Sequence, residues 1–368
     1  MFLLLWNPIV LLGVFAGYIL MFILASYLAP RVAGRLSGKF SLYTSMAILL
    51  VLIIIVFTLT LLGISYAVAY AVGVSTTPEG ITSILASLAL PLMIFVVIIN
   101  LITYLISPYI INLVYRARRD ERLQEIVDRV AQRLGLSKPP KAVVVSGPPN
   151  AFAYGNIVSG RHVAVTDRML DIMSDEELEA VVGHEIGHHL HRDNMVMLFL
   201  GILPSVIYYL GVTLLNIGAY GGGGSGNRRN GSSALLLLVA GIVAVMISFL
   251  LQILVLAFSR LREYYADFEG ARAAGRENMQ AALAKIHLYY QRAPTAREAI
   301  SSSSLKTLFI YAFTETYAEP FYRVSREDIE RIMRSSYSSL EEIFATHPPI
   351  PKRLRFLEKL SWFSSRPP

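Results

Sequence analysis

Residues 174–190 read SDEELEAVVGHEIGHHL, and they contain the pattern His-Glu-x-x-His at positions 184–188. His184 and His188 are four residues apart, so on an α-helix they lie about 40° from each other and can point at one metal ion. Glu185 follows His184 directly and would project beside that ion, where a carboxylate can take a proton from water. The motif therefore supplies two metal ligands and a general base.

The same stretch carries the signals of a well-defined helix. Ser174, followed three residues later by Glu177, is a capping box that starts a helix. The apolar residues behind it recur at helical spacing and predict a buried face made of Leu178, Val181, Val182, Ile186 and Leu190. Gly183 and Gly187 each cost about 1 kcal/mol of helix propensity relative to alanine. Glycine at these positions favours close packing of another segment against the helix.

The composition of the chain is that of a membrane protein. Of its 368 residues, 54% are hydrophobic and 16% are charged, whereas a soluble domain carries about 25% charged residues. Uncharged blocks long enough for the roughly 20 apolar residues that cross a bilayer run over residues 2–30, 40–78, 80–115, 195–227 and 231–259. The first block lacks a charged start and a small-residue cleavage site, so we expect a retained span and not a removed signal peptide.

The absence of cysteine and the distribution of charge exclude several classes of function. Without cysteine the chain has no disulfides, no thiolate metal ligands and no cysteine nucleophile. The net charge of +7 could indicate a nucleic-acid partner, but the basic residues cluster beside the apolar blocks, as membrane topology requires. We therefore expect the lipid bilayer, and no nucleic acid, as a partner. The oligomeric state is left open.

Basic residues also orient the spans. They follow the first apolar block, over residues 31–39, and the third, over 116–119, whereas the loop after the second block has none. The positive-inside rule then places segment 116–193 in the cytoplasm and the N-terminus outside. The fourth and fifth spans form a hairpin, so the chain returns at Arg260 to the side on which the His-Glu motif lies.

A third metal ligand is expected just beyond the fifth span. Catalytic zinc takes three protein ligands and keeps one position open for water. If the span continues as a helix through residues 259–267, SRLREYYAD, then Glu263 and Asp267 share one face. Glu263 would complete a His2Glu site, and Asp267 would accept the second N–H of a ligand histidine. Alternatively, both carboxylates pair with nearby arginines. His189 and His191 are expected to be exposed or interfacial and not ligands.

With these features the chain resembles the HtpX-type integral-membrane zinc metalloproteases, which are gluzincins related to the CAAX prenyl proteases. The resemblance spans roughly residues 118–357. It rests on five segments in order: NAFAYG at 150–155, VAVT at 163–166, the His-Glu motif, SRLREYYAD at 259–267, and HPP at 347–349 followed by Arg353. Members of that family typically have two spans before the catalytic domain, whereas this chain has three apolar blocks there.

The resemblance implies roles for individual residues. His184, His188 and Glu263 would bind one Zn²⁺ per chain, with Glu185 as the base. Asp267 would orient a ligand histidine. Relatives place a histidine and an arginine of the late His-Pro segment near the reaction centre. His347 and Arg353 match them and could stabilise the oxyanion, whereas His347 could also be a plain turn residue before two prolines.

Short segments before the motif predict a small sheet. Residues 141–146, 150–154 and 161–166 are rich in β-branched and aromatic side chains. An edge strand could bind substrate as an added strand through main-chain hydrogen bonds; its residues would be Asn150, Ala151, Phe152 and Ala153. The sheet could equally serve only to support the metal helix, and both roles are compatible. An amphipathic helix over residues 119–134 is expected to pack on this domain.

These features predict a mainly α membrane protein with about five transmembrane helices plus a cytoplasmic α+β metalloprotease domain of gluzincin type. The expected segments are an N-terminal membrane region (1–115), the first catalytic part (116–193), a transmembrane hairpin (194–259) and the second catalytic part (260–368). His188 lies about 10 Å of helix before the fourth span, and Glu263 about 6 Å beyond the fifth. The zinc should therefore lie close to the cytoplasmic membrane surface.

We expect a zinc-dependent endopeptidase of the plasma membrane that cleaves membrane or misfolded proteins in protein quality control. A CAAX-type prenyl-protein processing protease is an alternative, but it needs an enclosed chamber, for which five spans are few. A non-enzymatic scaffold with structural zinc is another, although such a site has no use for Glu185. The serine run at 301–304 predicts a flexible loop.

Overall fold

The computed structural model describes residues 42–221, 228–291, 324–337 and 347–360, together with residues 342 and 345. The first apolar block, most of the glycine-rich tip of the expected hairpin and the serine run at 301–304 lie outside the described residues. The chain divides into two compact units. One comprises Met1–Ile102 and Met197–Phe258, and the other comprises Thr103–Val196 and Ser259–Pro368.

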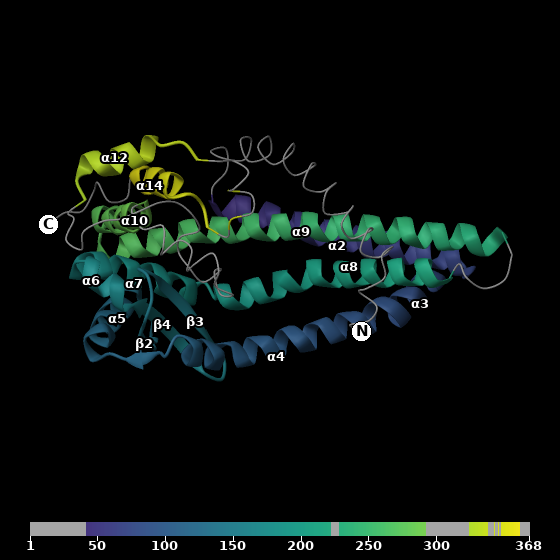
Figure 1. The fold of residues 1–368 in the computed structure, drawn as a ribbon, viewed down its shortest axis with the longest axis horizontal. Coiled ribbons are helices and arrows are strands. Elements are labelled where there is room, and N and C mark those ends of the chain that lie inside the picture. The colour runs from purple at the N-terminus through teal and green to yellow at the C-terminus, as the bar shows by residue number, and fades with distance from the viewer. Residues whose placement is uncertain are drawn as a thin grey trace. The chain divides into compact units, whose positions relative to one another are not determined.

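Apolar helices contribute most of the first unit (Figure 1). The described residues contain four helical stretches long and apolar enough to cross a membrane: Thr44–Val72, Pro78–Val114, Asp193–Tyr220 and Ser232–Ala274. The elements that form them are α2 (Leu42–Val72), α3 (Pro78–Ile84), the π-helix η2 (Leu85–Ala89), α4 (Leu90–Val114), α8 (Asp193–Gly221) and α9 (Arg228–Ala274). They cover the second to fifth apolar blocks, and α9 continues beyond the fifth block as far as Ala274. The predicted fold class, a mainly helical membrane protein with a small sheet, is confirmed.

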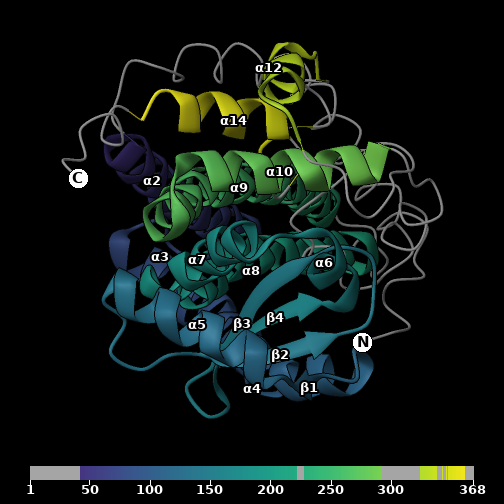
Figure 2. The ribbon, with the colours of Figure 1, turned by 90° about the vertical axis from the view of Figure 1, so that its left-hand side faces the viewer.

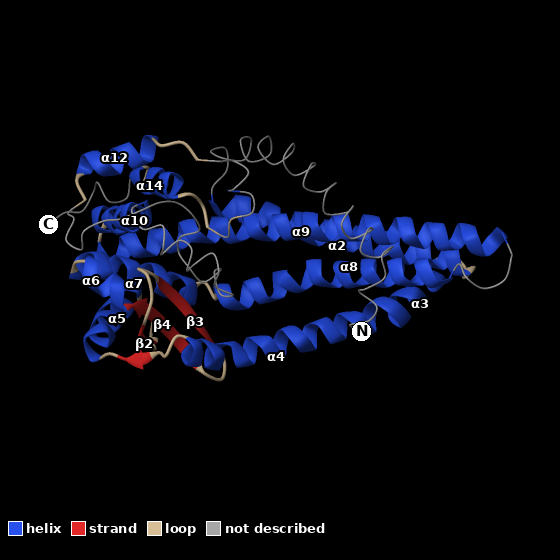
Figure 3. Cartoon of the chain, in the orientation of Figure 1, coloured by secondary structure: helices blue, strands red, loops and turns tan. Residues whose placement is uncertain are grey.

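The second unit contains a four-stranded sheet in the order β1-β2-β4-β3 (Figure 3). The strands are β1 (Arg118–Arg119), β2 (Lys141–Val145), β3 (Ala151–Asn156) and β4 (Gly160–Thr166). β2 runs parallel to β4 with Val143 opposite Ala164, and β3 runs antiparallel to β4 with Phe152 opposite the same alanine. Because β3 stands at the end of this order, its outer edge has no strand partner among the described residues.

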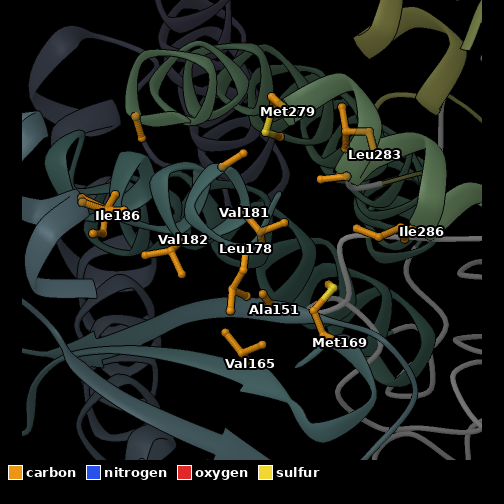
Figure 4. Packing of buried hydrophobic residues seen from close by; sticks show 14 of the residues in the cluster. Ala151, Val165, Met169, Leu178, Val181, Val182, Ile186, Met279, Leu283 and Ile286 are labelled. Atoms are coloured by element: carbon orange, nitrogen blue, oxygen red, sulfur yellow. The ribbon is translucent and has the colours of Figure 1, made fainter. Parts of the chain in front are cut away.

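Helices cover the sheet and build the core of this unit. They are α5 (Glu121–Leu134), α6 (Asp167–Ile172), α7 (Asp175–Leu190), α10 (Arg276–Gln291), α12 (Arg326–Arg334) and α14 (Ile350–Glu358). α7 contacts β3 and β4 on one side and α10 on the other (Figure 2). The apolar face predicted for the motif helix is buried: Val181, Val182 and Ile186 pack in one cluster with Met279 and Leu283 of α10 (Figure 4).

The predicted amphipathic helix begins two residues later than expected. Arg118 and Arg119 pair with β2 as a short strand, which the sequence analysis did not predict. Asp120 is then the N-cap, and its side chain accepts a hydrogen bond from the Leu123 amide at 2.8 Å. The helix therefore starts at Glu121, because an aspartate at the cap satisfies an amide that has no partner within the helix.

Candidate metal centre

The helix that carries the His-Glu motif is fixed at its start. The capping box is formed in both directions, with the Ser174 amide donating to Glu177 Oε2 at 2.8 Å and the Glu177 amide donating to Ser174 Oγ at 3.3 Å. Lys285 of α10 forms an ion pair with the same Glu177 carboxylate and donates to the Ile172 carbonyl oxygen at 2.9 Å. These contacts fix the first turn of α7 against α10, on the N-terminal side of the two histidines.

Glycines then let α7 and α9 approach each other closely. A Cβ atom on Gly183 would lie 2.5 Å from Ala273 Cβ, and one on Gly187 would lie 3.1 Å from Ala266 Cα. On the α9 side, a Cβ on Gly270 would lie 2.7 Å from the Ala180 carbonyl oxygen. Any side chain at these positions would push the helices apart. The close packing predicted from the two glycines of the motif is therefore present, and it brings α9 against the histidines.

Three side chains from these two helices converge. His184 Nε2 and His188 Nε2 are 3.3 Å apart, Glu263 Oε2 lies 3.7 Å from His184 Nε2, and Glu263 Oε1 lies 3.6 Å from His188 Nε2. Ligand atoms at the corners of a zinc tetrahedron with bonds of about 2.0–2.1 Å lie about 3.3–3.4 Å from one another. Among the described residues, these three form a group whose ligand atoms lie close enough together to hold one metal ion.

The donor set also fits a cation on chemical grounds. The Glu263 side chain is only 5% exposed, and its Oε2 accepts no hydrogen bond of acceptable geometry from any described residue. A buried carboxylate oxygen without a donor is costly unless a cation neutralises it. Two imidazoles and one carboxylate are the ligands of a His2Glu zinc site. The residues present therefore fit a zinc ion.

Asp267 and Arg353 stand behind His184. Asp267 Oδ1 lies 3.0 Å from His184 Nδ1, the ring nitrogen that does not face the other ligands. The Arg353 guanidinium binds the same carboxylate with two donors, Nε at 2.9 Å to Oδ2 and Nη2 to Oδ1. Both side chains are completely buried. Burial alone would lower the pKa of Arg353, but Asp267 and Glu263 raise it, so the arginine stays charged.

Asp193 takes the equivalent place behind His188, a contact that the sequence pattern did not predict. Its Oδ2 lies 2.7 Å from His188 Nδ1, and its other oxygen forms an ion pair with Arg262. Arg262 also donates to the His191 carbonyl oxygen at 2.9 Å. On a continuous helix, Asp193 would lie about 140° from His188. It reaches the histidine because the chain turns at Arg192, which has a left-handed φ of 55°.

Glu185 and His347 complete the surroundings of the cluster. Glu185 follows His184 on α7 and is 2% exposed. His347, in the segment before α14, places Nδ1 2.8 Å from Glu263 Oε2, although the angles do not make a hydrogen bond. Its side chain is 15% exposed. The structure thus brings His347 beside the expected metal ligand, whereas the donors of Arg353 are directed mainly at Asp267.

The histidines next to the motif do not join the cluster. His189 is buried, with Nε2 2.9 Å from the His162 carbonyl oxygen, and burial lowers its pKa to about 4. The expectation that it is exposed or interfacial is therefore wrong, because α7 turns this side chain toward β4. His191 is partly exposed and lies 3.6 Å from the Glu269 carboxylate.

The expected substrate strand lies at the edge of the sheet. Ala151, Phe152 and Ala153 begin β3, and Asn150 precedes it. The Asn150 amide donates to Thr166 Oγ1 at 2.9 Å, which ties the start of the strand to β4. The main-chain groups on the outer side of β3 face no described strand. Asn150, Ala151 and Phe152 are buried, so a segment added at this edge would meet main-chain groups and not these side chains.

Known proteins and one protein family are similar to this chain. The sequence model of "Peptidase family M48" matches residues 117–361. The "Protease HtpX homolog" of Pyrobaculum calidifontis is 59% identical over 266 residues, which are 72% of this chain and 76% of that protein. The "Protease HtpX homolog" of Pyrobaculum islandicum is 63% identical over 266 residues, which are 72% of this chain and 75% of that protein. The "Protease HtpX homolog" of Archaeoglobus fulgidus is 56% identical over 272 residues, which are 74% of this chain and 77% of that protein. The crystal structure of S. mikatae Ste24p aligns with a TM-score of 0.48 at 17% identity, covering 86% of this chain and 66% of that one.

Proposed function

The chain belongs to peptidase family M48 and is a membrane metalloprotease that hydrolyses peptide bonds, and we propose that its metal is zinc, held by His184, His188 and Glu263. The observation that carries the proposal is the spacing of 3.3–3.7 Å between the three ligand atoms, at the junction of α7 and α9. A ligand set of two imidazoles and a carboxylate favours zinc over magnesium or calcium, which prefer oxygen ligands.

The roles of the protein groups follow from their positions. A bound zinc ion would polarise the scissile carbonyl and acidify the attacking water. Glu185, beside the ligands on α7, takes the proton of that water and passes it to the leaving amine. Asp267 and Asp193 each hold one ligand histidine by its Nδ1 atom, which orients the ring and selects its tautomer.

His347 and Arg353 receive different roles in this proposal. Arg353 is completely buried and its two donors bind Asp267, so we assign it to positioning Asp267 and through it His184. His347 lies beside Glu263 and is partly exposed, and its Nε2 has no hydrogen-bond partner among the described residues. An imidazole with a free donor is suited to stabilising the oxyanion that forms during the reaction.

The substrate strand and the side of the membrane complete the proposal. The outer edge of β3 binds an extended substrate segment through its main-chain groups, along the stretch Asn150, Ala151, Phe152 and Ala153. The catalytic parts, residues 116–193 and 260–368, lie on the cytoplasmic side of the plasma membrane, as the basic residues over 116–119 indicate. Substrates are membrane proteins or unfolded proteins, cut near the bilayer as part of quality control.

Removing the metal tests the proposed function. Protein purified in detergent and stripped with a chelator should lose cleavage of unfolded casein, and added Zn²⁺ should restore it, whereas Mg²⁺ should not. Metal analysis of the restored protein should find about one zinc per chain, as one His2Glu site requires. Full cleavage by the stripped protein would contradict the proposal.

Asp193→Asn should weaken zinc binding by about 10–100-fold, the range typical for groups behind a metal ligand. The amide can no longer accept the His188 N–H as a charged carboxylate does, and it also loses the ion pair with Arg262. Competition with a chromophoric chelator measures the zinc affinity directly. Asp171→Asn, an exposed carboxylate on α6, is the matched control. An unchanged affinity in Asp193→Asn would remove this residue from the site.

A further inference from the structure

The turn between β3 and β4 exposes two apolar side chains. Ile157 is 75% exposed and Val158 is 67% exposed, and they stand next to each other at the tip. Turn tips that face water carry mainly glycine, proline, asparagine, aspartate or serine. Adjacent aliphatic side chains that project from a turn are therefore unusual for a surface in contact with water, and such patches mark interaction sites.

The turn is bound to the last turns of α4. Asn156 Nδ2 donates to the carbonyl oxygens of Tyr104 and Leu105 at 2.9 and 3.0 Å. Pro108 explains why the first of these is available: a proline has no N–H, so the carbonyl four residues earlier loses its helical donor. The Asn156 side chain replaces that donor, together with the Ser107 hydroxyl at 3.1 Å from the same oxygen.

Several amides of the turn are satisfied within the turn itself. Asn156 Oδ1 accepts hydrogen bonds from the amides of Val158 and Ser159 at 2.9 and 2.8 Å. The Asn156 amide in turn donates to Ser159 Oγ at 3.2 Å. Placing a polar backbone group in an apolar environment costs less when that group is hydrogen-bonded within the protein. The bonded amides of this turn therefore lower the cost of placing its tip against lipid, and the tip presents aliphatic side chains outward.

The helix to which the turn is bound presents an apolar surface at the same level. Tyr104 lies ten residues before Val114, or about 15 Å along the helix, inside the candidate span Pro78–Val114. From there to the end of α4 the exposed large side chains are Ile106, Tyr109, Ile110, Leu113 and Val114. The first charged residue after them is Arg116. Basic residues, which favour the lipid headgroup region, thus occur only beyond the end of this apolar surface.

We propose that the β3–β4 turn inserts into the lipid bilayer beside α4, with Ile157 and Val158 among the lipid acyl chains. Cations flank the tip: Lys141 Nζ lies 3.5 Å from the Ser159 carbonyl oxygen, and Arg161 is exposed at the start of β4. An apolar tip with basic residues beside it matches an anionic membrane surface. The metalloprotease domain therefore touches the bilayer through its sheet as well as through its helices.

One consequence concerns the substrate and rests on the proposed function. The edge strand β3 ends at Asn156, where the inserted turn begins. A segment paired along β3 would therefore have one end at the membrane. This geometry favours substrate segments that emerge directly from the bilayer over segments of distant soluble domains.

Fluorescence quenching in vesicles tests the insertion without any measurement of activity. The chain has no cysteine, so Ile157→Cys creates a single site for an environment-sensitive fluorophore. The full-length protein is reconstituted into vesicles of phosphatidylcholine and phosphatidylglycerol. Leu113→Cys, on the apolar surface of α4, is the lipid-exposed reference, and Glu176→Cys, at the exposed start of α7, is the water-exposed reference. Val158→Cys repeats the test if the first variant does not fold.

The label at position 157 should lose its emission with brominated lipid to the same extent as the label at 113. It should resist aqueous iodide, which quenches the label at 176. Iodide quenching equal to that at 176, without quenching by brominated lipid, would overturn the insertion. Protection from both quenchers would also overturn it, because a protein surface and not lipid would then cover the tip. Since no cleavage is measured, failure here is separate from failure of the proposed protease function.

Discussion

Replacing Glu185 by glutamine should lower the rate of peptide hydrolysis by about 10²–10⁴-fold, the contribution typical of a positioned general base. Glutamine has nearly the same size as glutamate and should not disturb the packing of α7, but its amide cannot take a proton from water. Because Glu185 is not one of the three converging ligands, bound zinc should remain at the wild-type level. Casein cleavage and metal analysis on the same sample measure both effects.

Glu176→Gln is the matched control for this variant. It makes the same chemical change in the same helix, at an exposed position of the first turn, and it should leave both cleavage and zinc content unchanged. Wild-type cleavage by Glu185→Gln would show that another group acts as the base. Loss of zinc together with activity would show that Glu185 holds the metal and does not act on water.

Replacing Arg353 by methionine should lower the free energy of unfolding by about 3–5 kcal/mol, the cost of leaving one member of a buried ion pair without its partner. Asp267 is completely buried. Among the described residues, the His184 ring is the other group in contact with its carboxylate besides Arg353. Methionine fills much of the space left by the arginine, so the lost charge dominates the effect. Thermal or denaturant unfolding of the purified protein measures the loss, and Lys359→Met, an exposed cation at the end of α14, is the control.

A double variant separates stability from positioning. Arg353→Met combined with Asp267→Leu removes both buried charges, so it should regain much of the lost free energy of unfolding. It should nevertheless bind zinc more weakly than the wild type, because nothing then holds His184 Nδ1. Wild-type zinc affinity in a stably folded double variant would show that the pair serves stability alone.

Much of the candidate site is predictable because helices impose a fixed period. His184 and His188 are four residues apart, and so are Glu263 and Asp267. This spacing places each pair on one helical face, and α7 and α9 are helices through these residues. Gly183 and Gly187 predict that another segment packs closely, since glycine is a poor helix former, and this segment is α9. The even number of spans between the two segments predicts that they lie on one side of the membrane.

Other parts of the site could not be predicted from spacing. Asp193 reaches His188 only because the chain turns at Arg192, and an arginine gives no sign that its φ will be left-handed. Arg353 was expected to face the reaction, but its burial beside Asp267 depends on how α14 packs against the rest of the unit. The bond from Asn156 to α4 joins residues about fifty positions apart, and no periodic pattern relates them.

By itself the sequence determined the membrane class and the helices, and it predicted the ligands and the base, because these depend on composition and on a local period of about 3.6 residues. The tertiary structure alone decided which carboxylate supports which histidine, that Arg353 is committed to Asp267, and that the β3–β4 turn is bound to α4. These contacts are between elements, and they follow from how whole helices and strands pack, which local spacing does not encode.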